Sequence, residues 1–88
     1  MKIKEGFMLR EVAGQWIVVP LGERVVEFSG IMTLSESGAE LWRKMEQSTT
    51  QKELIDTILS EYNVDEETAK EDVLEFVNKL KDKNLIEE

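Results

Sequence analysis

Residues 31–42 read Ile-Met-Thr-Leu-Ser-Glu-Ser-Gly-Ala-Glu-Leu-Trp. The first four residues are of strand type, and Ser35 is a favourable helix N-cap at the point where the pattern changes. Short strand-like runs separated by Gly and Pro come before this stretch, and apolar residues at helical spacing come after it. We therefore expect residues 31–34 to be the last strand before the chain becomes helical.

Two strand-like runs, at residues 7–12 and 15–19, are separated only by Ala13-Gly14. Such a short link containing Gly predicts a β-hairpin. Pro20 ends the second run, because proline cannot donate to a strand ladder. Residues 24–28 form a third extended run, either a full strand or an elaborated loop. The sequence thus predicts an antiparallel β-meander within about residues 7–34.

Three N-cap residues, Ser35, Thr50 and Asp65, each precede apolar residues at helical spacing. Thr50 and Glu53 fit a capping box, in which the Glu side chain reaches back to the cap. Asn84 tolerates the left-handed backbone that ends many helices, and residues 85–86 are expected to fold back onto the core. We expect three helices within about residues 35–83.

These elements predict an α+β fold in which a three-stranded antiparallel meander packs on three C-terminal helices. The last two helices are joined by a short turn and form a helix-turn-helix-like pair. With 88 residues, the chain is expected to be a single domain over residues 1–88 with one modest core.

The composition excludes most catalytic chemistry. The chain has no His and no Cys, so the commonest metal ligands and the usual general base near neutral pH are missing. The acidic run at residues 65–67 lacks the ligand spacing of a calcium loop and is explained as a helix cap. We expect no enzymatic activity, no metal and no cofactor.

Charge is divided unevenly along the chain. The formal net charge is −8, and residues 36–88 carry seven basic and fifteen acidic side chains. This balance opposes binding to nucleic acid, which depends on cationic contacts to phosphate. No apolar run approaches the ~20 residues of a membrane span, and the N-terminus lacks the apolar core of a signal peptide. We expect a cytoplasmic protein without membrane contact.

The strand at 31–34 carries no charge and no Pro, the features that usually protect an edge strand from pairing with another chain. On the third helix, Leu74 lies on the same side as Lys70, Asn78 and Lys81. Leu74 either widens the core face or lines a groove beside the open strand.

The order and spacing of several short motifs resemble the PqqD-like family, named for a protein of pyrroloquinoline quinone biosynthesis. The resemblance extends from about residue 7 to residue 86. Its motifs are Leu34-Ser35, Gly38-Ala39-Glu40-Leu41-Trp42, Thr50-Gln51-Lys52-Glu53-Leu54, Tyr62-Asn63-Val64-Asp65, Asp72-Val73-Leu74-Glu75-Phe76-Val77 and Asn84-Leu85-Ile86.

The resemblance implies a winged-helix-like fold that acts as a peptide-recognition element, or peptide chaperone. Such a domain binds the leader segment of a ribosomally made precursor peptide and presents it to a modifying enzyme, often a radical S-adenosylmethionine (SAM) protein. The leader would add as a strand at residues 31–34 and lie against the third helix. The implied peptide-binding residues are Ile31, Met32, Thr33, Leu34, Lys70, Val73, Leu74, Val77 and Lys81.

In this hypothesis, apolar leader side chains settle between the strand and the third helix, while Lys70 and Lys81 meet acidic leader residues at the rim. Two alternatives remain at this point. The helix-turn-helix could bind DNA, although the acidic side chains of its reading helix would repel phosphate. The open strand could instead pair with a second copy of the chain and make a dimerisation module.

Overall fold

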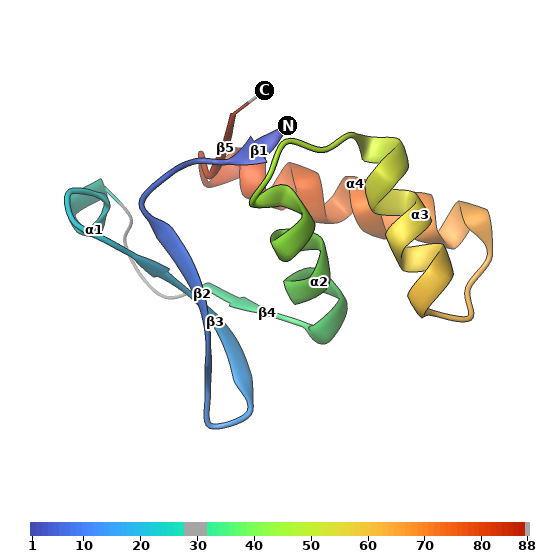
Figure 1. Ribbon diagram of the computed structural model, residues 1–88, viewed down its shortest axis with the longest axis horizontal. Coiled ribbons are helices and arrows are strands. Elements are labelled where there is room, and N and C mark those ends of the chain that lie inside the picture. Colours follow the sequence, from blue (N-terminus) through green and yellow to red (C-terminus); the bar gives the residue numbers. More distant parts are fainter. Residues whose placement is uncertain (28–31, 88) are drawn as a thin grey trace.

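The computed structural model describes residues 1–27 and 32–87. Its main sheet has the strand order β2-β3-β4 and is antiparallel throughout, with β2 at Phe7–Val12, β3 at Gln15–Pro20 and β4 at Met32–Leu34. The β2–β3 hairpin extends away from the helices, and β4 leads directly into the helical half (Figure 1).

The hairpin turn is the predicted one. Ala13 and Gly14 both have positive φ, at 51° and 79°, and Val12 pairs with Gln15 on either side of them. Two successive positive φ angles match the twist of the flanking strands, which is why Gly is favoured here. This part of the predicted meander is confirmed.

Of the two alternatives for residues 24–28, a full strand or an elaborated loop, the full strand is wrong where it can be compared. Arg24–Glu27 forms a short helical segment, α1, and Phe28 lies outside the described residues. The Arg24 N–H donates to the carbonyl of Leu21, and the Arg24 guanidinium lies 5.5 Å from the centroid of the Phe7 ring. These contacts with a preceding turn and with β2 override the strand propensity of two adjacent valines.

Three longer helices begin at the predicted N-caps. They are α2 (Glu36–Met45), α3 (Gln51–Glu61) and α4 (Glu66–Asp82). The cap of α2 accepts a hydrogen bond from the Gly38 N–H at 3.1 Å. Asp65 accepts one from the Thr68 N–H at 2.8 Å. Hydrogen bonding from the Thr68 side chain first, and from its backbone N–H second, holds the pKa of the Asp65 carboxyl below its usual value. The capping residues alone were therefore enough to place all three helix starts.

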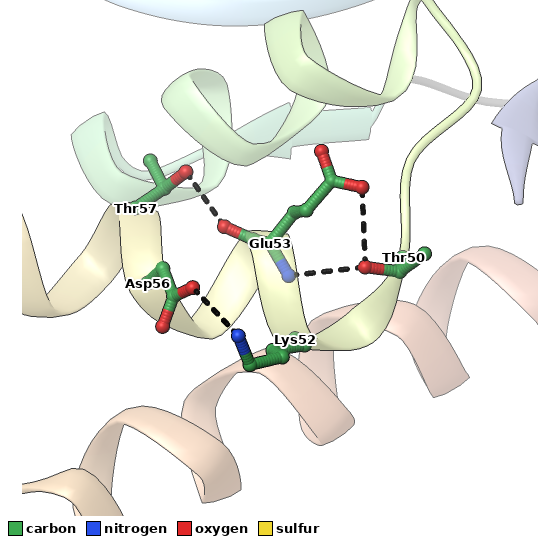
Figure 2. A network of polar contacts seen from close by, with 5 residues as sticks. All are labelled: Thr50, Lys52, Glu53, Asp56 and Thr57. Carbon is green, nitrogen blue, oxygen red and sulfur yellow. Dashed lines mark hydrogen bonds and ion pairs between the residues drawn. The ribbon is translucent and has the colours of Figure 1, made fainter.

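The start of α3 carries a modified capping box (Figure 2). The Glu53 N–H donates to the Thr50 hydroxyl at 3.2 Å. That hydroxyl in turn donates to the Glu53 carboxylate, also at 3.2 Å, so the carboxylate contacts the side chain of the cap instead of its backbone N–H. Lys52 and Asp56 form an exposed ion pair at 3.9 Å, which contributes little stability.

The two ends of the chain lie side by side (Figure 1). Strand β1 (Lys2–Ile3) pairs antiparallel with β5 (Ile86–Glu87). Before that pairing, Asn84 adopts φ 60° and Leu85 donates its N–H to the carbonyl of Leu80, as expected for a left-handed helix end. The return of residues 85–86 to the core is confirmed.

The core lies between the inner face of the sheet and the helices. Trp42, Met45, Leu54, Leu80 and Leu85 are its largest fully buried side chains. Val18 and Met32 supply the sheet side of this cluster. The predicted α+β architecture, a three-stranded sheet packed on three helices, is confirmed.

Candidate functional site

Strand β4 lies at the edge of the sheet. It pairs with β3 through Trp16↔Leu34, Ile17↔Thr33 and Val18↔Met32. Within residues 1–27 and 32–87, no strand pairs with its other edge. The main-chain groups that point to that side are therefore available to an incoming strand.

The hairpin turn determines which main-chain groups these are. A two-residue turn makes Val12 and Gln15 a hydrogen-bonded pair, and hydrogen-bonded and non-bonded pairs then alternate along the ladder. Ile17, two residues after Gln15, therefore points its N–H and C=O towards β2 and away from β4. Thr33 lies opposite Ile17, so its N–H and C=O point to the open edge.

The side chains of β4 alternate between the two faces of the sheet. Met32 is only 2% exposed and belongs to the core, and Leu34 is half-buried on the same inner face. Thr33 is exposed on the outer face. Met32 can therefore contribute main-chain groups to a ligand but no side-chain surface, while Ile31 lies outside the described residues.

A hollow of about 260 Å³ opens at the end of β4, between the start of α2 and the helices α3 and α4. Its lining residues are Ser35, Ser37, Gly38, Leu41, Ile58, Asp72, Glu75, Phe76 and Lys79. The ring of Phe76 approaches the start of α2 so closely that a Cβ on Gly38 would lie 3.3 Å from it and 3.5 Å from the Cβ of Leu34. The absent side chain of Gly38 thus lets α4 pack beside the end of β4.

The helix flank beside β4 differs from the one expected from the sequence. Residues two apart on an α-helix point about 160° apart, so Leu74 lies on the opposite flank of α4 from Phe76. Lys70 and Lys81 share the Leu74 side, where Leu74 is 37% exposed. The structure therefore does not bring these three residues together with the hollow at the end of β4.

Two more of the expected residues are buried. Val73 is 0% exposed and Val77 is 5% exposed, and both belong to the core cluster. They lie beneath the surface of α4 and hold it in place. Phe76, which is not among the residues expected to bind peptide, packs against this core and is left half-buried at the hollow.

Carboxylates dominate the surface around the end of β4. Asp72 and Glu75 line the first hollow together with one cation, Lys79. A second hollow lies beside it, contains Ser35 as well, and includes Glu11 and Glu36. The site therefore combines main-chain hydrogen-bonding groups, a partly apolar floor and an acidic rim.

The family model described as Coenzyme PQQ synthesis protein D (PqqD) matches residues 15–86. The chain belongs to the PqqD family. This confirms the resemblance drawn from the motifs, and the match includes β3, β4 and the three long helices. A comparison with curated proteins gave no match.

Two solved structures resemble this PqqD-family chain. One is "TbiB1 in Complex with the TbiA(beta) Leader Peptide", with a TM-score of 0.77, 25% identity, and coverage of 99% of this chain and 95% of that one. The other is "Lasso peptide synthetase B1 complexed with the leader peptide", with a TM-score of 0.74, 14% identity, and coverage of 96% and 93%. The second supports the fold alone.

The described residues of this PqqD-family chain contain no group of three or more side chains suited to hold a metal ion. None of the helices within them is long and apolar enough to cross a bilayer. The site presents the open edge of β4 and the two hollows that adjoin its end.

Proposed function

We propose that this chain binds the leader segment of a ribosomally made precursor peptide by adding it as a strand to β4. The main observation behind this proposal is the open edge of β4, where the N–H and C=O of Thr33 point outwards. Strand addition of this kind takes affinity from the backbone and specificity from pockets for alternate side chains. The complex of TbiB1 with the TbiA(beta) leader peptide supports the proposal.

The proposed role is non-catalytic. The domain would hold the leader while a separate enzyme, a radical SAM protein or another peptide-modifying enzyme, acts on the rest of the precursor. Residues 31–34 would supply the docking strand, with Leu34 and Phe76 as the nearest partly exposed apolar side chains. The lack of His and Cys in the chain and membership of the PqqD family support this division of labour.

DNA binding by the helix-turn-helix is the less favoured function. Glu67, Glu71, Asp72 and Glu75 are all exposed on α4, the helix that would have to enter a groove of the duplex. Four carboxylates on the reading helix would repel phosphate.

The strand-addition proposal can be tested with peptides selected for binding. A phage-displayed library of random dodecapeptides is panned on the wild-type protein. The selected peptides are synthesised, and their affinities are measured by titration calorimetry. Thr33→Pro removes the outward N–H without removing a hydrogen bond to β3, because that N–H points to the open edge. We expect its affinity for these peptides to fall by about tenfold or more, since a main-chain hydrogen bond is lost and the ring blocks close approach.

Thr33→Val is the matched control, because it keeps the N–H and the strand propensity, and its affinity should stay near that of wild type. Undiminished affinity in folded Thr33→Pro protein would rule out strand addition at this edge. Sedimentation of the unliganded protein separates peptide binding from self-pairing, because a dimer formed through β4 would compete with the peptides.

A further inference from the structure

We infer that the groove at β4 selects a basic peptide: an extended segment carrying one bulky apolar side chain and, next to it, Lys or Arg. The apolar side chain would enter the hollow over Phe76, and the cation would meet Asp72 and Glu75. This inference rests on the proposed function and names the chemical class of its ligand. The sequence suggested acidic leader residues that would meet Lys70 and Lys81. Because these lysines lie on the other flank of α4, the ligand residues at the groove are basic instead.

The hollow suits a single anchoring side chain. Its volume of about 260 Å³ lies just below the range of about 300–1,000 Å³ typical of sites for whole small molecules. Leu41, Ile58 and Phe76 give it an apolar floor, and the half-buried Leu34 adjoins it from the docking strand. A peptide paired with β4 would place alternate side chains on this side of the strand, where one of them can fill the hollow.

The acidic rim comes from the carboxylates that line the two hollows. Asp72 and Glu75 line the first hollow, whereas Lys70 and Lys81 occupy the opposite flank of α4. The second hollow adds the carboxylates of Glu11 and Glu36. Lys79 is the cation within the two hollows, which leaves a clear excess of negative charge facing the ligand.

Arg43 is a second cation near the groove. Its guanidinium lies 4.5 Å from the centroid of the Trp16 ring, a distance at which cation and ring attract each other, and Trp16 lines the second hollow. The charge of Arg43 therefore lies near the second hollow, and Asp72 and Glu75 of the first hollow carry the preference for a basic ligand. An acidic peptide would meet the like charges of Asp72 and Glu75 along α4, and such contacts disfavour a partner.

A second copy of the chain is a poor occupant for the same reason. The described part of its own docking strand, Met32–Leu34, carries no basic residue, and each copy has a formal net charge of −8. Pairing two such edges would bring together two rims that are each lined by more carboxylates than cations. The charge of the groove thus favours a basic peptide over self-association.

The panned dodecapeptides provide the test. We expect Lys or Arg to be enriched at a constant spacing from an aromatic or large aliphatic residue. Replacing that basic residue by Glu in a synthetic winner should weaken binding by about tenfold or more, and raising the salt from low to physiological ionic strength should weaken it as well.

The protein side is tested with isosteric variants. Asp72→Asn/Glu75→Gln should lower the affinity of the basic peptide by about tenfold, since each neutralisation removes an opposite charge close to the ligand. Glu67→Gln/Glu71→Gln changes the net charge equally, on exposed positions away from the groove, and should leave the affinity within about twofold. Melting curves of both double variants establish that they are folded.

Each outcome is decisive. The basic-ligand inference would be overturned if the selected peptides were not enriched in Lys or Arg, or if the two double variants lowered the affinity equally. Strand addition would then still be decided by the comparison of Thr33→Pro with wild type. Basic winners that bind Thr33→Pro as well as wild type would instead remove the proposed function. Failure to select any peptide would contradict both.

Discussion

Thr49 is a buried residue whose backbone groups are hydrogen-bonded but whose side-chain hydroxyl is not. Its carbonyl accepts a hydrogen bond from the N-terminal ammonium of Met1 at 2.8 Å, and its N–H donates to the carbonyl of Met1 at 2.9 Å. Its hydroxyl is buried and has no hydrogen-bond partner among the described residues. The backbone of Thr49 thus ties the N-terminus to the helices, while its hydroxyl costs stability.

Thr49→Val should raise the free energy of unfolding by about 1 kcal/mol. It removes a buried polar group whose desolvation costs about 1–3 kcal/mol and keeps the shape of the side chain and both main-chain bonds. Urea denaturation measures the change. Thr49→Ser, which keeps the hydroxyl and loses a methyl group, should show no gain, and a Thr49→Val protein less stable than wild type would contradict the assignment.

Helix α4 shows how one element serves both core and surface. Ala69, Val73, Val77 and Leu80 form its buried stripe. The flank beside β4 carries the partly exposed Phe76, and the opposite flank carries Leu74. Both flanks have an apolar residue within reach of a ligand, but the hollow beside β4 lies on the Phe76 side.

Phe76→Ala should reduce the affinity for selected peptides by about tenfold, because the apolar surface that covers the anchoring side chain is lost. Leu74→Ala should leave affinity unchanged. Both are measured by calorimetry on protein shown to be folded by circular dichroism. The reverse order of effects would place the ligand on the Lys70 and Lys81 flank of α4.

At the scale of the whole molecule, the two terminal strands pair with each other and cover one side of the core. Strands β1 and β5 pair, and the Lys4 N–H donates to the carbonyl of Leu85 at 2.9 Å. Leu85 is fully buried beside these contacts. Residues more than 80 positions apart in the sequence thus complete a core that also supports the sheet and α4.

Leu85→Ala should lower the free energy of unfolding by about 2–5 kcal/mol, the usual cost of emptying a buried leucine site. This is a large share of the about 5–15 kcal/mol that stabilises a typical domain. Chemical denaturation gives the value, and Glu87→Ala at an exposed position of β5 serves as the control. Because Leu85 lines neither of the two hollows beside β4, the folded fraction should retain its peptide affinity.

Interactions between residues close in the sequence were sufficient to predict the hairpin turn and the starts of the three long helices. Ala13-Gly14 supplies the positive φ angles of a hairpin turn, and Ser35, Thr50 and Asp65 satisfy the first N–H groups of three helices. These interactions join residues a few positions apart, so they can be inferred without the fold. The position of β4 as the last strand, and with it the open edge, followed from the order of the elements.

Tertiary structure decided the features that depend on distant partners. Arg24 lies over Phe7, and the segment at Arg24–Glu27 becomes helical in spite of its strand propensity. Strand β1 exists only because β5 pairs with it. The sequence shows that α4 has two flanks, but only packing against α2 and the end of β4 selects the Phe76 side, and that selection makes the groove acidic. Helical periodicity gives the angle between residues on one helix, whereas the direction that each flank faces is determined by contacts far away in the chain.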